Sequence, residues 1–345
     1  MLRYEHGGDI YGDAEIRLDF SVNVNPLGMP GAAKRALFAA TDAMERYPDP
    51  QCRALRQALA EKHGVAADMI LCGNGAADMI FRVCACLKPK KALTLAPTFS
   101  EYERPVKLFG GEMAEYHLKE AGDFALTDAV LEALTPDVEL FVLCNPNNPT
   151  GRLAPFDLLR RIAAACAESG TLLMVDECFL AFTSGQSMVS LLHEFPNLLI
   201  LNAFTKLYAL AGLRLGYLLC ADTALLSRIA AFGAEWSVSA AAQAAGLGAL
   251  EEPAWTERTR SLIQQECASM RKRLMALGLT VFPSDTNFLL IKSPVPLYEP
   301  LKKRGILVRN CANFTGLNDQ FIRIGLKTRE KNEALLQALK EVLHG

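Results

Sequence analysis

The sequence has no excess of charge of one sign, because 36 lysines and arginines stand against 38 aspartates and glutamates. The resulting formal charge of -2 provides no broad basic surface, so we expect no nucleic acid partner. Any binding site for an anion would therefore have to be built locally, from a few side chains and backbone amides.

Clustered metal ligands are also missing. The chain has only five histidines, and none of its ten cysteines forms a Cys-x-x-Cys pair, so we predict no metal site. Most of the cysteines sit in apolar runs, where a thiol packs as a small hydrophobic group. Scattered cysteines of this kind favour a reducing compartment, and we expect a cytoplasmic protein.

Long hydrophobic runs are the third absence. The first 20 residues carry charges where a signal peptide has an apolar segment. The most apolar stretch, Leu198–Cys220, is interrupted by Lys206 and Arg214, so we expect no membrane span. The overall composition, with 51% hydrophobic residues, is that of a globular protein that buries a sizeable core.

The sequence does contain an alternation of short apolar runs and helical patterns, from about residue 51 to residue 250. This alternation is typical of βαβ units, which build parallel sheets. After residue 251 a long helical pattern precedes short strands, one over Ile306–Arg309, and a final helix, which indicates a small α+β unit. The candidate strands of the first part are Met69–Cys72, Ala92–Leu95, Leu140–Cys144, Leu172–Val175, Leu198–Asn202 and Leu215–Cys220.

Polar, glycine or proline residues follow directly after several of these strands, where open α/β sheets bind their ligands. Gly73 and Gly75 precede an apolar helix, whose first free N–H groups suit a phosphate. A dinucleotide-binding pattern would need a third glycine in place of Asp78, so we predict a phosphate cradle of another kind. The same residues are also compatible with an ordinary turn between a strand and a helix.

Three further strand ends carry side chains suited to chemistry. In Asn145–Gly151 two prolines fix an asparagine amide, which could bind a hydroxyl or a carboxylate, or could simply stiffen a turn. Asp176 ends an apolar strand, where a carboxylate needs a partner such as a protonated ring nitrogen, unless it caps a helix. Lys206 follows the next strand, and an apolar setting would make it a nucleophilic amine, unless its head group reaches water.

Two arginines complete the set. Arg214 lies eight residues after Lys206 and could add positive charge to the same pocket. Arg323 lies in the late apolar strand Phe321–Gly325, where a half-buried guanidinium needs an anion. That anion could be a substrate carboxylate or a structural ion-pair partner.

The order of these residues resembles that of the fold-type I pyridoxal-phosphate (PLP) enzymes, the class I/II aminotransferase family. The resemblance implies an α/β fold with a large, doubly wound, mostly parallel sheet domain over residues 46–251. The chain ends, 1–45 and 252–345, would form a small α+β domain, and two chains would form a homodimer with PLP at the subunit boundary. The resemblance covers essentially the whole chain and rests on the spaced set Asn148, Asp176, Lys206, Arg214 and Arg323.

The resemblance also implies roles in cofactor binding. Lys206 would form the Schiff base with PLP, and Asp176 would pair with the pyridine nitrogen, which makes these two the catalytic residues. Phe99 would stack on the ring, and Asn148 would hold its hydroxyl. The cofactor phosphate would be held by Gly75, Ala76, Ala77, Thr205, Arg214 and by Tyr47, which would reach the site of the partner subunit.

A narrower resemblance is to the threonine-phosphate decarboxylases within this family. It rests on His6-Gly7-Gly8, on Asp19–Gly28 and on Arg309–Phe314. It implies decarboxylation of a phosphorylated amino acid, O-phospho-L-threonine, to (R)-1-aminopropan-2-yl phosphate for cobalamin biosynthesis. The implied substrate contacts are His6, Gly7, Asn23, Asn148, Arg309 and Arg323, with Lys327 a further candidate for the substrate phosphate.

Two positions depart from the aminotransferase pattern. Phe179 replaces a tyrosine that usually donates to the ring oxygen, and because the decarboxylases share this phenylalanine, it favours them. Ala203 replaces a serine that contacts the cofactor phosphate, and it favours neither activity. An aminotransferase acting on histidinol phosphate is the alternative. A ligand sensor within a transcription regulator is not expected, because the enzyme-like pattern fills the chain.

Overall fold

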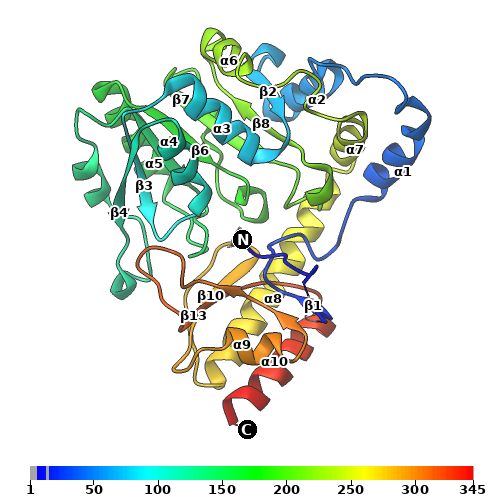
Figure 1. Ribbon diagram of the computed structural model, residues 1–345, viewed down its shortest axis with the longest axis vertical. Helices are drawn as coiled ribbons and strands as arrows, with labels where there is room; N and C mark the ends of the chain where they lie inside the picture. Colours follow the sequence, from blue (N-terminus) through cyan, green and yellow to red (C-terminus); the bar gives the residue numbers. More distant parts are fainter. Residues whose placement is uncertain (1–5, 13–14, 345) are drawn as a thin grey trace.

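The computed structural model describes residues 6–12 and 15–344, and its main feature is a seven-stranded sheet (Figure 1). The strand order is β2-β8-β7-β6-β5-β3-β4, and only β8 runs antiparallel to its neighbours. The predicted mostly parallel sheet is therefore confirmed. The strands are β2 (Ile70–Gly73), β3 (Lys91–Ala96), β4 (Glu112–His117), β5 (Leu140–Cys144), β6 (Leu172–Asp176), β7 (Leu198–Ala203) and β8 (Gly216–Leu219).

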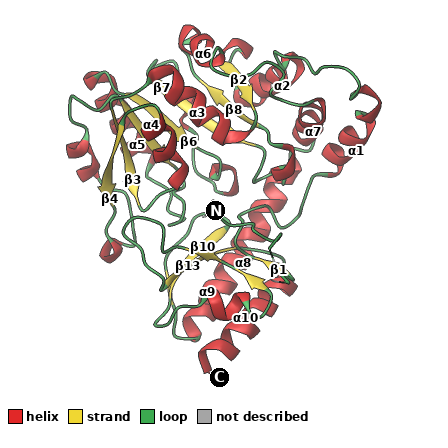
Figure 2. Ribbon diagram, viewed as in Figure 1, coloured by secondary structure: helices red, strands yellow, loops and turns green. Residues whose placement is uncertain are grey.

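Both faces of this sheet are buried, which explains the near-continuous apolar runs. In β5, Phe141 and Leu143 belong to one hydrophobic cluster, whereas Leu140, Val142 and Cys144 belong to a second. Alternate side chains thus enter cores on opposite faces. Helices cover the sheet (Figure 2): α2 (Arg53–His63), α3 (Gly75–Leu87), α4 (Glu103–Leu108), α5 (Phe156–Ser169), α6 (Thr223–Ala230) and α7 (Ala240–Leu250).

The remaining strands form two smaller sheets around the long helix α8 (Ala254–Ala276) (Figure 1). The antiparallel sheet β12-β13-β10-β9 contains Arg309–Asn310, Phe321–Gly325, Phe288–Lys292 and Thr280–Val281. The second sheet pairs β1 (Leu18–Asp19) with β11 (Ile306–Leu307) in parallel. The predicted strand Ile306–Arg309 is therefore divided at Val308 between two sheets. Helices α9 (Tyr298–Lys302) and α10 (Arg329–His344) complete this part of the chain.

The N-terminal arm joins both small sheets. The Phe20 N–H donates to the Leu307 carbonyl over 2.7 Å, and the Gly325 N–H donates to the Phe20 carbonyl over 2.7 Å. Helix α1 (Gly31–Ala39) instead packs on α7, beside the large sheet. The division of the chain into residues 46–251 and the two ends stays a prediction.

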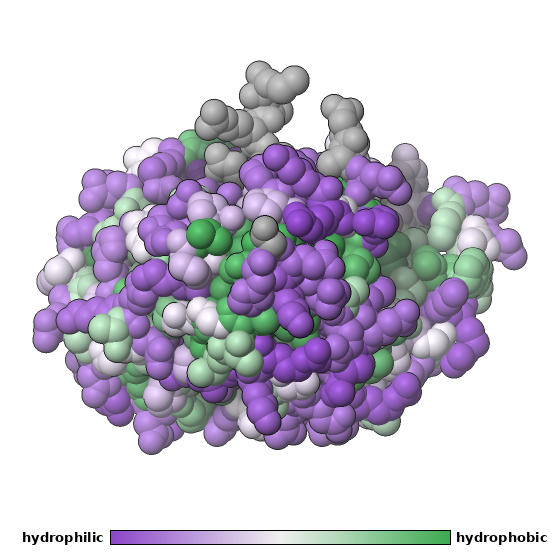
Figure 3. All heavy atoms as spheres, turned by 90° about the horizontal axis from the view of Figure 1, so that it is seen from below, coloured by the Kyte–Doolittle hydropathy of each residue, from purple (hydrophilic) through white to green (hydrophobic). Residues whose placement is uncertain are grey.

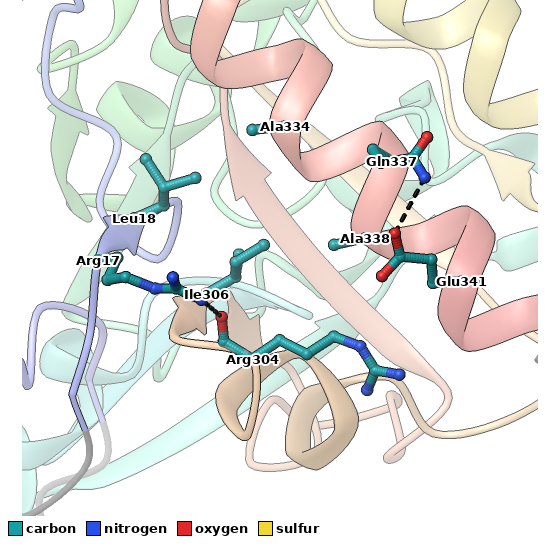
Figure 4. Close-up of a pocket in the computed structure, with 8 residues that line it drawn as sticks. All are labelled: Arg17, Leu18, Arg304, Ile306, Ala334, Gln337, Ala338 and Glu341. Carbon is teal, nitrogen blue, oxygen red and sulfur yellow. Dashed lines mark hydrogen bonds between the residues drawn. The ribbon is translucent and has the colours of Figure 1, made fainter.

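The surface of the described residues is mostly hydrophilic on the face in Figure 3, with apolar side chains between the polar ones. No helix within 6–12 and 15–344 is long and apolar enough to cross a membrane. A cavity of about 440 Å³ lies between the β1-β11 pair and α10 (Figure 4). Arg17 and Arg304 border it, and Arg17 donates to the Arg304 carbonyl over 3.1 Å. No predicted site residue lines this cavity.

Candidate active site

The predicted site residues gather at the carboxyl ends of neighbouring strands. Strands β5, β6 and β7 lie side by side, and Asp176, the last residue of β6, pairs with Cys144 of β5 and Leu201 of β7. Asn148 and Lys206 follow the ends of β5 and β7 in the loops that leave this edge. The sheet therefore brings together side chains that are far apart in the sequence, at the edge where α/β sheets bind ligands.

The phosphate cradle forms where β2 turns into α3. Gly75 begins α3 with a φ of +85°, and a Cβ there would lie 2.7 Å from the Arg214 Nη2 atom. A Cβ on Gly216 would lie 2.6 Å from the Gly75 carbonyl carbon, so β8 and the start of α3 approach closely. The amides of Ala76 and Ala77 and the exposed Arg214 guanidinium thus lie at one helix N-terminus, which suits an anion.

Asp78 has a structural role where a dinucleotide-binding turn would have glycine. Its carboxylate accepts from the Asn74 N–H over 2.8 Å and from the Arg82 guanidinium over 2.9 and 2.7 Å. Arg82 also donates to the Ser237 hydroxyl over 2.8 Å. The ion pair therefore fixes the first turn of α3 to the segment before α7.

Asp176 is a buried carboxylate with two donors. Its Oδ2 accepts from the Tyr102 hydroxyl over 2.6 Å, and its Oδ1 accepts from the Cys178 N–H over 2.9 Å. Phe99 lies close by, because its ring meets the Tyr102 ring edge to face, with the centroids 5.5 Å apart. Sequence reasoning did not single out Tyr102, although it lies only three residues after Phe99.

Lys206 is half-buried, and its amine lies 5.7 Å from the centre of the Phe179 ring. Burial, and then the positive charge of Arg323, lower the pKa of Lys206 to about 8. A lowered pKa increases the share of neutral amine near neutral pH, as a nucleophilic lysine requires. Asn25 holds this segment, because its N–H donates to the Lys206 carbonyl over 3.0 Å and its side chain to the Leu207 carbonyl over 2.7 Å.

Arg323 joins three parts of the chain. Its guanidinium donates to the Asn148 side-chain oxygen and, over 2.7 Å, to the Ser21 carbonyl. Burial lowers the pKa of Arg323 to about 10, and its face lies 5.4 Å from the centre of the Phe288 ring. The buried Nε atom has no hydrogen-bond partner among the described residues. Among the described residues, no salt bridge joins this guanidinium to a carboxylate, so Arg323 is suited to bind the carboxylate of a substrate.

The residues implied for the substrate phosphate lie in two places. His6 contacts the Glu101 carboxylate over 2.7 Å, and its ring lies 6.0 Å from that of Phe99. Gly7 is the next residue of the arm. The arm is held in place at Gly8, whose N–H donates to the Ser21 hydroxyl over 2.7 Å. Figure 1 shows this end of the chain between the large sheet and the smaller sheets.

Arg309 is buried in β12, where it donates to the Asn310 carbonyl over 2.6 Å and to the Asn313 side chain over 2.7 Å. It pairs in register with Arg323 of β13, so the two arginines come from facing positions of one sheet. Asn23 is also buried, and its Oδ1 has no hydrogen-bond partner among the described residues. Lys327 donates to the Val22 carbonyl over 3.2 Å, and burial lowers its pKa.

The remaining predicted residues are distributed as follows. Thr205 and Ala203 are buried beside Lys206, and Phe179 is buried with its ring 5.0 Å from that of Phe288. Tyr47 is 81% exposed, and its ring lies tilted by 32° against that of the exposed Trp236, with the centroids 4.7 Å apart. Across residues 6–12 and 15–344, no cluster of three or more histidine, cysteine, aspartate or glutamate side chains could hold a metal ion.

The fold and this arrangement define a known class of enzymes. The model for the aminotransferase class I and II family matches residues 15–339, and the chain belongs to this family. The predicted fold-type I architecture is confirmed by a histidinol-phosphate aminotransferase from Clostridium acetobutylicum, which is 28% identical with a TM-score of 0.88. That comparison covers 94% of this chain and 99% of the other.

Two other relatives are threonine-phosphate decarboxylases. The protein of that name from Salmonella typhimurium strain LT2 is 42% identical over 357 residues, which is 100% of this chain and 98% of the relative. The crystal structure of L-threonine-O-3-phosphate decarboxylase from Porphyromonas gingivalis has a TM-score of 0.84 at 26% identity. It covers 95% of this chain and 100% of the other.

The enzymes of this family use PLP, and the site fits that cofactor on its own chemistry. A helix N-terminus with Arg214 suits the phosphate, a buried carboxylate suits the pyridine nitrogen, and Lys206 has the lowered pKa of a reactive amine. The prediction that PLP is the cofactor is therefore confirmed. The residue-by-residue contacts to it stay predictions.

Proposed function

We propose that this protein is a PLP-dependent decarboxylase that converts O-phospho-L-threonine to (R)-1-aminopropan-2-yl phosphate. The observation that carries the proposal is the 42% identity over the whole chain to a threonine-phosphate decarboxylase. The half-buried Lys206 and the buried Asp176 and Arg323 support it. The product belongs to cobalamin biosynthesis, and the reaction would take place in the cytoplasm.

Bound PLP supplies an electron-accepting ring for the charge that develops on the substrate Cα atom. Asp176 would accept the N–H of the ring nitrogen. The N-terminus of α3, with Arg214 and Thr205, would bind the cofactor phosphate. Lys206 is in position to hold a proton and return it to Cα, because its pKa of about 8 permits both charge states near neutral pH.

Orientation of the substrate decides which bond at Cα breaks. Arg323 binds the α-carboxylate, and Asn148, which accepts from Arg323, shares this position. Arg309 of β12 and His6 of the N-terminal arm are the residues that would bind the side-chain phosphate. Two fixed anions would restrict rotation about the Cα–N bond and so select the bond to the carboxylate, rather than the bond to hydrogen, for cleavage.

The direct test is product analysis of the purified, PLP-loaded protein with O-phospho-L-threonine and no keto acid. Release of CO₂ together with (R)-1-aminopropan-2-yl phosphate is the expected result. The second candidate is an aminotransferase on histidinol phosphate, favoured by the TM-score of 0.88 to such an enzyme. Absence of CO₂, with amino transfer from histidinol phosphate to 2-oxoglutarate, would replace the proposal by that alternative.

We further propose that two chains form a homodimer in which Tyr47 contacts the cofactor phosphate of the partner subunit. The support is the exposed pair Tyr47 and Trp236, because two large aromatic rings in contact at a surface are typical of an interface. A tyrosine that served its own subunit would instead lie close to Gly75 and Arg214.

Mixing two inactive variants tests this arrangement. Tyr47→Ala subunits retain Lys206, and Lys206→Ala subunits retain Tyr47, so a mixed dimer contains one complete site. Random reassociation should restore about a quarter of the wild-type activity, because half of the dimers are mixed and have one good site of two. If Tyr47 acts within its own chain, the mixture stays as inactive as the separate variants. Sedimentation of each variant as a dimer is the control.

A further inference from the structure

Tyr102 is a fully buried tyrosine behind the carboxylate that we assign to the pyridine nitrogen. It is 1% exposed and immediately precedes α4, and its hydroxyl donates to the Asp176 Oδ2 atom over 2.6 Å. Its ring meets Phe99 at an interplanar angle of 84°. One side chain therefore touches both the ionic partner and the stacking partner that we propose for the cofactor ring.

The environment of Asp176 makes this donor important. Asp176 is 6% exposed, and its other oxygen accepts the backbone N–H of Cys178 over 2.9 Å. Each oxygen of this buried carboxylate thus has one fixed donor. The Tyr102 hydroxyl is the side-chain donor that sets the orientation in which the carboxylate can meet a ring N–H.

Tyr102 is suited to remain a donor at every working pH. Burial, followed by the neighbouring charge of Asp176, raises the pKa of Tyr102 well above its usual value. The phenol therefore stays protonated, and Asp176 oxygen is the acceptor of its hydrogen.

We propose that Tyr102 is a positioning residue that holds the Asp176 carboxylate in the orientation in which it can accept the N–H of the PLP ring. A hydrogen bond donated to one oxygen restricts rotation of the carboxylate, so the group keeps one fixed direction toward the ring nitrogen. The inference rests on the proposed function, because it needs PLP bound with its nitrogen at Asp176.

The experiment compares two cofactors on two proteins. Tyr102→Phe removes a single oxygen atom and keeps the ring packing on Phe99. With PLP, we expect the dissociation constant of the cofactor to rise about tenfold, as for loss of a hydrogen bond to a charged group. With 1-deaza-PLP, in which C–H replaces the ring nitrogen, no proton is shared. The variant and the parent protein should then bind within about twofold of each other.

A matched control is Tyr217→Phe, because Tyr217 is also buried and its hydroxyl contacts His63 over 3.0 Å rather than Asp176. It should leave the dissociation constants of both cofactors unchanged. If Tyr102→Phe weakened the binding of PLP and of 1-deaza-PLP equally, Tyr102 would have a packing role and the inference would be overturned. Unchanged binding of PLP by Tyr102→Phe would also overturn it.

Asp176→Asn separates this inference from the proposal on which it rests. Weaker PLP binding by Asp176→Asn, with no effect of Tyr102→Phe, would overturn the role of Tyr102 alone. The assignment of Asp176 would be overturned, and the inference with it, by two results together. The wild-type protein would bind PLP and 1-deaza-PLP with equal dissociation constants, and Asp176→Asn would leave both constants unchanged. The expected result is that Tyr102→Phe and Asp176→Asn each weaken the binding of PLP and leave the binding of 1-deaza-PLP nearly unchanged.

Discussion

Replacement of Lys206 by alanine should lower kcat by about 10⁴-fold or more, because the chain loses both its nucleophilic amine and its proton carrier at Cα. The variant should also lose the covalent attachment of PLP. Borohydride reduction followed by intact mass measurement detects that attachment directly. The wild-type protein should gain the mass of the reduced cofactor, whereas the variant should keep the mass of the bare chain.

Lys62→Ala is a suitable control, since Lys62 is an exposed lysine that donates to the Tyr208 hydroxyl over 2.7 Å. It should retain both activity and the reduced adduct. A cofactor adduct on the Lys206→Ala protein, mapped to another lysine, would show that the reactive amine had been assigned to the wrong residue.

Replacement of Arg323 by leucine should lower kcat/KM by about 1,000-fold, because a guanidinium can donate two charge-assisted hydrogen bonds to a carboxylate. The kcat/KM of Arg323→Lys should lie between those of the wild-type protein and Arg323→Leu, since lysine keeps the charge and loses the planar pair of donors. Steady-state kinetics over a wide range of substrate concentration measures both variants. An unchanged kcat/KM in a folded Arg323→Leu protein would exclude this arginine as the carboxylate site.

The same variant tests the electrostatics of the site. The Arg323 charge is the second cause, after burial, of the lowered pKa of Lys206. Its removal should therefore move the pKa of Lys206 up from about 8. Deprotonation of the amine, followed through the pH dependence of its labelling in the PLP-free protein, should shift to higher pH in Arg323→Leu and not in Arg323→Lys.

The strands that the sequence predicts best are those buried on both faces. A run such as Leu140–Cys144 is apolar throughout, because both of its faces enter a core. Strand β4 was not predicted, since it lies at the edge of the sheet and its residues Glu112–His117 are only exposed or half-buried. The two-residue strands β1 and β9 depend on partners distant in the sequence, so no local pattern indicates them.

The site could be predicted where residue type and strand end coincide, as for Asp176 and Lys206. Local sequence could not decide between the adjacent amides of Asn147 and Asn148. The structure distinguishes them, because Asn147 bonds to the Pro97 carbonyl and the Thr98 hydroxyl, whereas Asn148 meets Arg323. Tyr102 lay outside any prediction, since only the folded sheet brings its hydroxyl to Asp176.

The pairing of the N-terminal arm with β11 and β13 sets an order for events during synthesis. The arm is made long before its partners at Leu307 and Arg323, which follow it by almost the whole length of the fold. All proposed cofactor contacts within one chain have been translated by Arg214. The nascent protein thus carries the parts of its cofactor site well before the arm can pair with β11 and β13 and place the residues proposed to recognise a substrate.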